Sequence, residues 1–489
     1  MKKKIVAATL ALTLITGSLT GCAGLSKDST KSVKLAPNNP ITLTVWHYYN
    51  GTQQAIFDEL LDEFNSTVGA EEGIHMEGYS YGSVSDLEQA VTDSVNEEVG
   101  AKDLPAIFSS YPDTAYSVEQ KGKLADISSY FTEDELSAYV DSYIQDGYFD
   151  GEDALYLFPV AKSTEIMMIN KTDWETFAEA TGTTLEELST TEGVTQVAEK
   201  YYNWTDSLTP DIPDDGKAFY GRDSMSNYFV IGMKQMGTDI FEVKDGKVTV
   251  NTDKEKLHRL WENYYVPYMK GYFAAYGKFR SDDVKTGDII AYTGSTSSAF
   301  YFPDNVESDT DLYPIEYIMQ EAPIMENGEN YRVQQGAGMA VTKADEKQEY
   351  ASCVFLKWFT QKENNLKFVA ESSYMPVLKE ASDIDVVDQV IKDENLGVNE
   401  KSYDCLKQVL TDFDDIQFYT SKTCENGYSM RKVLDYNLSD RIAADQEALE
   451  AAIASGSSRE EGLSKYISED SFESWYEDFC DALSQAKAN

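Results

Sequence analysis

The sequence predicts an α/β protein with at least two lobes. Short apolar runs typical of β-strands alternate with helical stripes over the first third of the chain, a pattern that favours a sheet of parallel strands. Beyond an N-terminal leader and a polar segment, about 450 residues remain, more than one compact core usually holds. Together these two observations predict two or more lobes.

The first 22 residues have the three parts of a secretory signal. Lysines at positions 2–4 precede an apolar run over 5–15, which is too short for a stable membrane span. The run leads to Leu-Thr-Gly-Cys at 19–22. This tetrapeptide resembles the bacterial lipobox, in which cleavage leaves the cysteine, here Cys22, as a lipid-bearing N-terminus. Two acyl chains on it would give stable anchoring. An ordinary signal peptide with a chance cysteine is the alternative.

Residues 23–40 are polar and rich in small residues, Pro and Asn, so we expect a flexible linker. The first strand begins at Ile41, in the stretch ITLTVWHYYNG over 41–51. A helix should follow over 53–64, because Phe57, Leu60, Leu61 and Phe64 have the i, i+3, i+4, i+7 spacing of one apolar stripe.

The same reasoning predicts the remaining elements. Further strands are expected at 74–79, 105–110, 289–293 and 338–342, two strand-like runs within 155–170, and a hairpin over 241–250 around Asp245-Gly246. Helices are expected at 86–99, 114–121, 183–187, 193–204, 224–236, 254–268 and 347–359, and the last third should be mostly helical, ending in a stripe of Phe472, Trp475, Tyr476, Phe479 and Leu483.

Composition excludes some classes of partner. The formal net charge is −44, from 85 acidic and 41 basic residues, and such a chain repels nucleic acid and anionic lipid. Apart from Cys22, the cysteines are widely spaced at 353, 405, 424 and 480. We expect free buried thiols, with a Cys405–Cys424 disulfide as the alternative.

The sequence contains no catalytic motif that would indicate an enzyme. It has only three histidines and lacks HExxH, G-x-S-x-G, a P-loop and G-x-G-x-x-G. We therefore predict a binding protein without catalytic residues, metal or cofactor. A surface glycoside hydrolase stays open, because acidic pairs are abundant and their separation in space is not visible in sequence.

Eight short segments, in order along nearly the whole mature chain, together with the lipobox and linker, carry a family resemblance. They read LTVWH at 43–47, LADI at 124–127, LFPV at 157–160, INK at 169–171, GDIIA at 287–291, GAGMAV at 336–341, FLKWF at 355–359 and YMPV at 374–377. The chain resembles the extracellular solute-binding proteins of bacterial ABC importers, the family that includes maltose-binding and glycerol-phosphate-binding proteins.

This resemblance implies a type II periplasmic-binding-protein-like fold, with two α/β lobes joined by a hinge that the chain crosses more than once. We expect residues 41–158 with 292–345 in one lobe, and 159–291 with 346–489 in the other. It also implies a monomer outside the cytoplasm, held to the membrane only by its lipid, that delivers a small-molecule ligand to ABC permease subunits. A receptor that feeds a sensor kinase, or an adhesin, would have the same fold.

In α/β sheets, ligands bind beyond the carboxyl ends of the strands. The residues that the resemblance and this rule place at the ligand are Trp46, His47, Tyr48, Ser110, Tyr111, Asp113, Ser163, Thr164, Asp223, Ser224, Tyr228, Gly294, Ser295, Thr296, Gly336, Ala337, Gly338 and Tyr374. Core packing of Trp46, surface tyrosines, and a helix-capping turn at 294–298 are the structural alternatives.

These residue types suit a polyhydroxylated ligand. Aromatic rings cover the apolar face of a sugar at low entropy cost, so Trp46 to Tyr49 are interpreted as a platform. Small residues let backbone N–H groups approach hydroxyls. A glycerol-phosphate or glycerophosphodiester ligand is the alternative, but the arginine expected at the phosphate is displaced here, to Arg431. A mono- or oligosaccharide is preferred.

Overall fold

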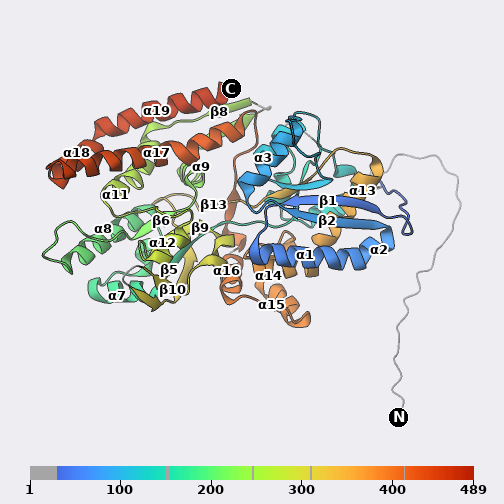
Figure 1. The fold of residues 1–489 in the computed structure, drawn as a ribbon, viewed down its shortest axis with the longest axis horizontal. Helices are drawn as coiled ribbons and strands as arrows, with labels where there is room; N and C mark the ends of the chain where they lie inside the picture. The colour runs from blue at the N-terminus through green and yellow to red at the C-terminus, as the bar shows by residue number, and fades with distance from the viewer. Residues whose placement is uncertain (1–29, 150–152, 245–246, 309–310, 412, 489) are drawn as a thin grey trace, which may run out of the picture.

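The computed structural model describes residues 30–149, 153–244, 247–308, 311–411 and 413–488, and these form two lobes side by side, each with a sheet covered by helices (Figure 1). The expected two-lobe α/β fold is confirmed. Cys22 and the turn at 245–246 lie outside the described residues. Within those ranges, the helices are all too short or too polar to cross a membrane.

The first lobe contains the earliest strands, and the chain returns to it after β13 to add one more strand and several helices. Its strands are β1 (Ile41–His47), β2 (Ile74–Ser80), β3 (Ile107–Ser110), β4 (Leu157–Pro159) and β14 (Gly338–Val341). Its helices are α1 (Gly51–Ser66), α2 (Val68–Glu72), α3 (Val84–Val95), α4 (Pro112–Glu119), η1 (Ser128–Tyr130), α5 (Glu133–Ser137), α6 (Asp141–Gln145), α13 (Glu346–Phe359), α14 (Lys362–Ser372), η4 (Lys379–Ala381), α15 (Ile384–Asp393) and α16 (Glu400–Thr411).

The second lobe contains the middle of the chain and the C-terminal helices. Its strands are β5 (Glu165–Asn170), β6 (Tyr220–Arg222), β7 (Phe241–Lys244), β8 (Lys247–Val250), β9 (Ala291–Ser295), β10 (Asn305–Glu307), β11 (Leu312–Pro314) and β12 (Tyr317–Glu321). Its helices are α7 (Lys171–Thr181), η2 (Leu185–Leu188), α8 (Thr191–Ser207), α9 (Met225–Gln235), α10 (Lys254–Glu262), α11 (Tyr265–Met269), α12 (Arg280–Thr286), η3 (Thr296–Tyr301), α17 (Gly427–Ala454), α18 (Arg459–Tyr466) and α19 (Glu469–Ala488). Between the lobes lie β13 (Tyr331–Val333), η5 (Phe413–Asp415) and β15 (Gln417–Tyr419).

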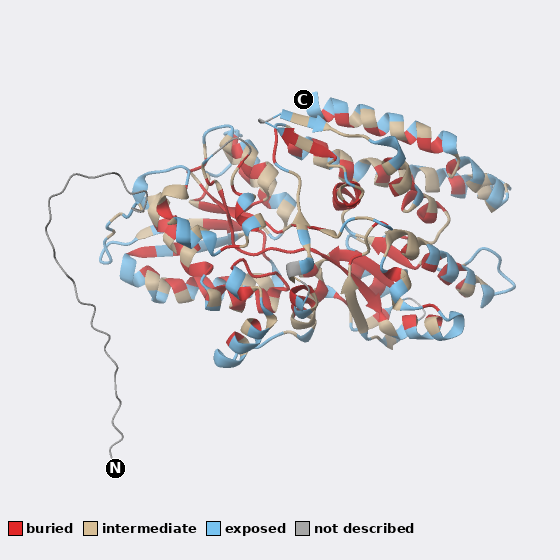
Figure 2. Ribbon diagram, turned by 180° about the vertical axis from the view of Figure 1, so that it is seen from behind, coloured by how far each residue is buried: buried red, intermediate tan, exposed pale blue. Residues whose placement is uncertain are grey.

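The apolar periodicity located most of these elements correctly. The predicted stripe Phe57, Leu60, Leu61 and Phe64 is the buried face of α1, and the predicted hairpin is the antiparallel pair β7–β8. The expected helix over 254–268 is instead two helices, α10 and α11, separated at Asn263-Tyr264. Figure 2 shows the buried residues concentrated in the strands and on the inner faces of the helices.

Strand direction differs from the predicted parallel arrangement. The first sheet has the order β2-β1-β3-β14-β4, in which β1 is parallel to β2 and β3, whereas β14 is antiparallel to β3 and β4. The second has the order β12-β5-β9-β6, and only β6 and β9 are parallel. In the first sheet, β14 enters after the chain has passed through the second lobe, a route that local periodicity does not encode.

The strand pairing also divides the chain differently from the expected lobe boundaries. The expectation placed 292–345 in the first lobe and 346–489 in the second. β9 instead pairs with β5 and β6 in the second sheet, while α13 and α14 pack against β1 and α1 in the first lobe. Over the described residues, the chain passes between lobes after β4, after β13 and after α16.

The four described cysteines are free. Cys353, Cys405 and Cys424 are buried, and the thiol of Cys405 donates to the carbonyl oxygen of Thr296 at 3.7 Å. The prediction of free thiols is therefore confirmed, and the Cys405–Cys424 disulfide is not present.

A buried lysine joins two of the crossings to the first lobe. Lys162 is 1% exposed, and its Nζ donates to Asp146 Oδ2 at 2.9 Å and to the carbonyl oxygen of Gly336 at 3.3 Å. Gln334 Nε2 also donates to Asp146 Oδ2, at 2.5 Å. Asp146 follows α6, whereas Lys162 and Gln334 belong to the first and second crossings.

Replacing Lys162 by Met should destabilise the protein by about 3–5 kcal/mol, because the Asp146 side chain is only 12% exposed and its charge would be left without a partner. Urea unfolding followed by fluorescence measures this. Asp146→Asn in the same chain should recover part of the loss. Lys379→Met, which removes an exposed ion pair with Asp141, should cost no more than about 1 kcal/mol. An unchanged midpoint for Lys162→Met would contradict the proposed role of the pair.

Candidate functional site

A cavity of about 460 Å³ lies between the lobes and is lined by both of them and by the second crossing. The first lobe contributes Glu88 of α3 and residues 111–114, and the crossing contributes residues 334–336. The second lobe contributes Asp223, Ser224, Ser226, Asn227 and the start of α17. The lining therefore comes from segments that are far apart in sequence, and it is mostly polar.

The first-lobe side of the cavity carries carboxylates. Tyr111 follows β3 and precedes Pro112, which occupies the first turn of α4 as proline commonly does. This places Asp113 in the first helical turn, next to the cavity. Burial raises the pKa of Asp113, and Arg431 partly opposes the shift. Burial also raises the pKa of Glu88, whose Oε1 accepts a hydrogen bond from Thr114 at 3.1 Å.

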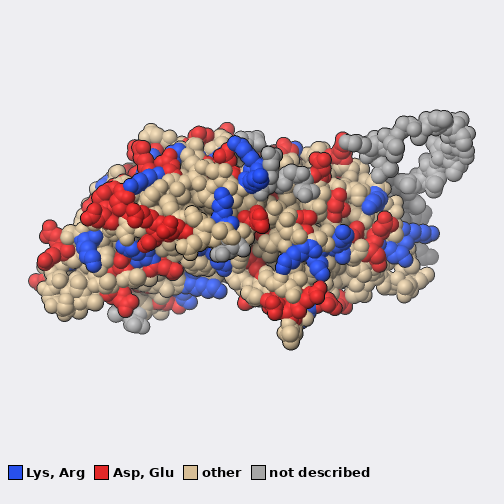
Figure 3. Space-filling model, turned by 90° about the horizontal axis from the view of Figure 1, so that it is seen from above, with Lys and Arg blue, Asp and Glu red and all other residues tan. Residues whose placement is uncertain are grey.

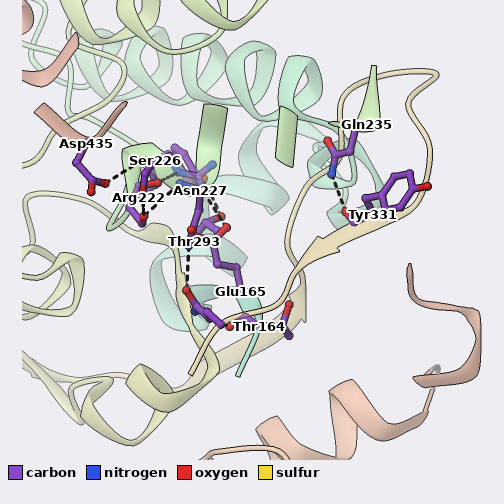
Figure 4. Close-up of polar contacts among 12 residues, drawn as sticks. Thr164, Glu165, Arg222, Ser226, Asn227, Gln235, Thr293, Tyr331 and Asp435 are labelled. Atoms are coloured by element: carbon purple, nitrogen blue, oxygen red, sulfur yellow. Dashed lines mark hydrogen bonds and ion pairs between the residues drawn. The ribbon is translucent and has the colours of Figure 1, made fainter. Parts of the chain in front are cut away.

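The second-lobe side is organised by a hydrogen-bonded network around Asn227 (Figure 4). Asn227 Nδ2 donates to Glu165 Oε1 and to Gln335 Oε1, both at 2.9 Å. Arg222 Nη2 donates to Glu165 Oε2 at 2.8 Å, and Arg431 Nη2 donates to Asn227 Oδ1 at 3.0 Å. The network connects β5, β6, α9 and α17 to the second crossing. The second-lobe side of the cavity is therefore hydrogen-bonded directly to the hinge.

One face of α17 presents two tyrosines to the cavity. Tyr428, Lys432 and Tyr436 are spaced four residues apart and line the cavity, and the two rings are 39% and 54% exposed. Lys432 Nζ lies 5.0 Å from the Tyr428 ring centroid and 5.6 Å from that of Tyr436. The opposite face, with Met430, Leu434 and Leu438, is buried.

Sequence reasoning missed these tyrosines. The signal was present, because Met430, Leu434 and Leu438 form an apolar stripe and both tyrosines fall outside it. Arg431, which was expected to be displaced from a phosphate position, also lines the cavity.

Charge in the cavity is unbalanced toward acid. Five carboxylates line it, from Glu88, Asp113, Asp146, Asp223 and Asp435, against the two cations Arg431 and Lys432. The surface has the same bias, and acidic side chains gather in clusters over the second lobe when the molecule is seen from above (Figure 3). An anionic ligand would therefore meet repulsion that a neutral ligand would not.

Five of the residues expected at the ligand line this cavity: Tyr111, Asp113, Asp223, Ser224 and Gly336. The others lie around it or inside a lobe. Ser110 Oγ donates to the carbonyl oxygen of Tyr111 at 2.9 Å, and Tyr228 hydroxyl donates to that of Leu260 at 2.8 Å in the second core.

Residues expected at the end of β9 and at the crossings serve local structure. Ser295 caps η3, with its Oγ accepting from Ser297 N at 3.3 Å, so the capping alternative describes this turn, which also contains Gly294. Thr296 N donates to the carbonyl oxygen of Thr164 at 2.8 Å. Ser163 pairs with Gln335 across two crossings, and Ala337 and Gly338 lead into β14.

The aromatic platform expected at Trp46 to Tyr49 is buried inside the first lobe. His47 has no exposed surface, and its ring lies 4.7 Å from Phe57 and 5.2 Å from Tyr49 between ring centroids. Trp46 is 4% exposed, with its edge against Tyr81. Tyr48 hydroxyl hydrogen-bonds Tyr374 hydroxyl at 3.1 Å. The rings fill the space between β1, α1 and α14, which a strand end facing solvent would have left open.

Two lobes, joined by several crossings around a polar cavity, define a protein that holds a ligand between its lobes. Residues 59–397 match the family described as bacterial extracellular solute-binding protein. This range is more than half of the chain, and the chain belongs to that family, whose members are binding proteins that act outside the cytoplasm.

Solved structures with the same fold cover almost the whole chain. The cyclic alpha-maltosyl-1,6-maltose binding protein of Arthrobacter globiformis has a TM-score of 0.62 at 18% identity, over 92% of this chain and 100% of that one. UgpB of Mycobacterium tuberculosis, in complex with glycerophosphocholine, has 0.61 at 16%, over 91% and 99%. The maltotriose binding protein of Thermus thermophilus has 0.58 at 12%, over 91% and 99%.

These likenesses establish the two-lobe fold of type II sugar-binding proteins. A comparison with curated proteins gives no match.

Burial lowers the pKa of His47 to about 4, below its value near 6.5 in an unfolded chain. The unfolded state then binds more protons between these values, so stability should fall by about 3 kcal/mol as pH drops from 6.5 to 4. In His47→Phe this contribution should vanish. Urea unfolding of both proteins at pH 7 and pH 4.5 measures the difference, and an equal pH dependence in the two would show that His47 is not enclosed.

Proposed function

We propose that this chain is the substrate-binding lipoprotein of an ABC importer, which captures a carbohydrate in the cavity between its lobes and delivers it to membrane permease subunits. The protein would be anchored through lipid on Cys22 and would act as a monomer. The observation that carries the proposal is the position of the cavity, whose lining comes from both lobes and the hinge.

A ligand that contacts both lobes favours the conformation in which both can reach it. Capture then shifts the population toward the closed form by as much as the ligand binds that form better. A permease that recognises the closed form would receive loaded proteins preferentially. The close approach of α17 to α4 fits such closure, because a Cβ at Gly427 would lie 2.8 Å from Asp113 Oδ1.

The chemistry of the lining supports a polyhydroxylated ligand. Tyr111, Tyr428 and Tyr436 offer rings for the apolar faces of sugar units. Asp113, Asp223, Ser224 and the backbone of Gly336 offer acceptors and donors for hydroxyl groups, and we propose them as ligand contacts. Structural relatives with this fold are described with maltotriose, a cyclic maltosyl-maltose and cycloalternan.

A glycerophosphodiester is the second candidate ligand. Arg431 and Lys432 line the cavity, arginine is a strong phosphate ligand, and UgpB was solved with glycerophosphocholine. The five surrounding carboxylates make this ligand less favourable than a neutral sugar.

A thermal-shift screen of the purified mature protein tests the function. Maltotriose, cycloalternan, xylo-oligosaccharides, monosaccharides and glycerophosphocholine should be included. A true ligand at a hundred times its Kd stabilises by about 2.7 kcal/mol, so at least one carbohydrate should raise Tm in a concentration-dependent way. A shift with glycerophosphocholine alone would select the second candidate, and release of shorter sugars would reveal a hydrolase.

Tyr428→Ala should weaken binding of the best carbohydrate by about tenfold, because a stacked ring contributes about 1.4 kcal/mol. Isothermal titration calorimetry measures the change. Tyr79→Ala is the matched control, since Tyr79 is 44% exposed on β2 and does not line the cavity. If Tyr428→Ala and the unmodified protein bind the carbohydrate with equal affinity, Tyr428 of α17 is not part of the ligand site.

A further inference from the structure

We propose that Arg280 is the positioning residue of the ligand site, holding the carboxylate of Asp223 as a fixed hydrogen-bond acceptor for a ligand hydroxyl. This inference rests on the proposed function for its ligand, and it adds a residue that does not line the cavity. It makes the Arg280–Asp223 pair a determinant of specificity for ligands that donate hydrogen bonds.

Asp223 lies where the second sheet meets the cavity. It directly follows β6 and lines the cavity, and its side chain is 21% exposed. Its Oδ1 accepts the backbone N–H of Arg280 at 2.9 Å, and Arg280 Nε lies 3.7 Å from the same oxygen. Among the described residues no hydrogen-bond donor to Oδ2 is seen, so this acceptor keeps its capacity for a ligand hydroxyl.

Arg280 is itself immobilised from the side away from the cavity. It is 5% exposed, and its guanidinium forms an ion pair with Asp283 and donates to the carbonyl oxygen of Gly277 at 2.5 Å. Asp283 is 2% exposed and accepts the backbone N–H groups of Gly277 and Tyr276 at 2.6 and 3.2 Å. The loop before α12 therefore holds Arg280 in place, and Arg280 in turn holds the carboxylate of Asp223.

A glycine on the neighbouring strand leaves room for this carboxylate. A Cβ at Gly294, on β9, would lie 2.6 Å from Asp223 Oδ2, closer than two such atoms can approach. Gly294 was expected to contact the ligand; its geometry instead gives it a role in seating Asp223. Any side chain there would displace the acceptor.

The charges around Asp223 come from four elements. Burial raises its pKa to about 6, Arg280 of α12 and Arg222 of β6 lower it, and Glu165 of β5 raises it. Tyr292 of β9 also faces it. Asp223 is therefore ionised at pH 7.5 and protonated at pH 5, and loss of Arg280 would move this transition to higher pH.

The first experiment needs no ligand. The unfolding free energies of the unmodified protein and of Asp223→Asn are compared from pH 4 to 8. Because the folded pKa is above the unfolded value, the unmodified protein should lose stability relative to Asp223→Asn as pH rises from about 4 to 6. The same comparison in an Arg280→Gln background, which removes the guanidinium charge, should show a transition at higher pH. An unmoved transition would overturn the proposal.

The second experiment uses the carbohydrate found by the thermal-shift screen. Affinity should fall about tenfold between pH 7.5 and pH 5 as a charged acceptor is lost, and Asp223→Asn should bind weakly with no such pH dependence. Gly294→Ala, which keeps Arg280 intact, should weaken binding in the same way, whereas Arg259→Gln is the control because Arg259 pairs with Glu192 away from the cavity. Full affinity in Asp223→Asn would overturn the proposal.

The two experiments fail separately. If no carbohydrate binds, the proposed function fails, and the ligand-free titration still decides whether Arg280 controls the ionisation of Asp223.

Discussion

The ammonium group of Lys162 is buried where the first two crossings meet the first lobe. Burying a charge costs several kcal/mol unless hydrogen-bond partners replace its water, and here Asp146 Oδ2 at 2.9 Å and the Gly336 carbonyl at 3.3 Å replace it. Gln334 binds the same carboxylate. These contacts fix the first two crossings relative to each other where they leave the first lobe. The position of the second lobe depends on how these crossings are held.

The contacts of Lys162 and Asp146 also determine which residues line the cavity on the hinge side. The residues that line it on the hinge side, 334–336, include the two that this pair holds: Gly336 is bound by Lys162 and Gln334 by Asp146. Gln335 then continues into the network of Asn227, Glu165 and Arg431 on the second lobe. A movement of one lobe must therefore act through hydrogen bonds that also shape the cavity, so a ligand held there would bias the position of the lobes.

The charges that line the cavity restrict the class of ligand more than the shape of the cavity does. The first lobe presents Glu88 and Asp113, while α17 presents Arg431 and Lys432 across the cavity. These charges attract one another when the lobes approach, yet the remaining carboxylates leave a net negative lining. A neutral ligand with many hydroxyl groups can satisfy both signs of charge, whereas a phosphodiester satisfies only the smaller cationic part.

Much of the local structure could be predicted from the sequence, while the site could be predicted only in part. The stripe of α1 and the last amphipathic helix, α19, followed from spacing alone, since burial of every third or fourth residue is a local property. Tyr111 and Asp113 were expected at the ligand because strand ends gather at one edge of a sheet, whereas Asp223, Ser224 and Gly336 were expected there from the family resemblance. Burial of Trp46 to Tyr49 inside the first lobe was not predicted, because local pattern does not reveal which helices cover a strand end.

By itself, the sequence determined the elements, the α/β class, the acidic charge and the family resemblance, because all four depend on residue type and short-range spacing. Only the tertiary structure decided the strand directions, the lobe to which β9 and α13 belong, and the cavity face of α17 with Tyr428 and Tyr436. Those features depend on the path of the chain between lobes, and that path is fixed by contacts such as Lys162 with Asp146, which join residues through space.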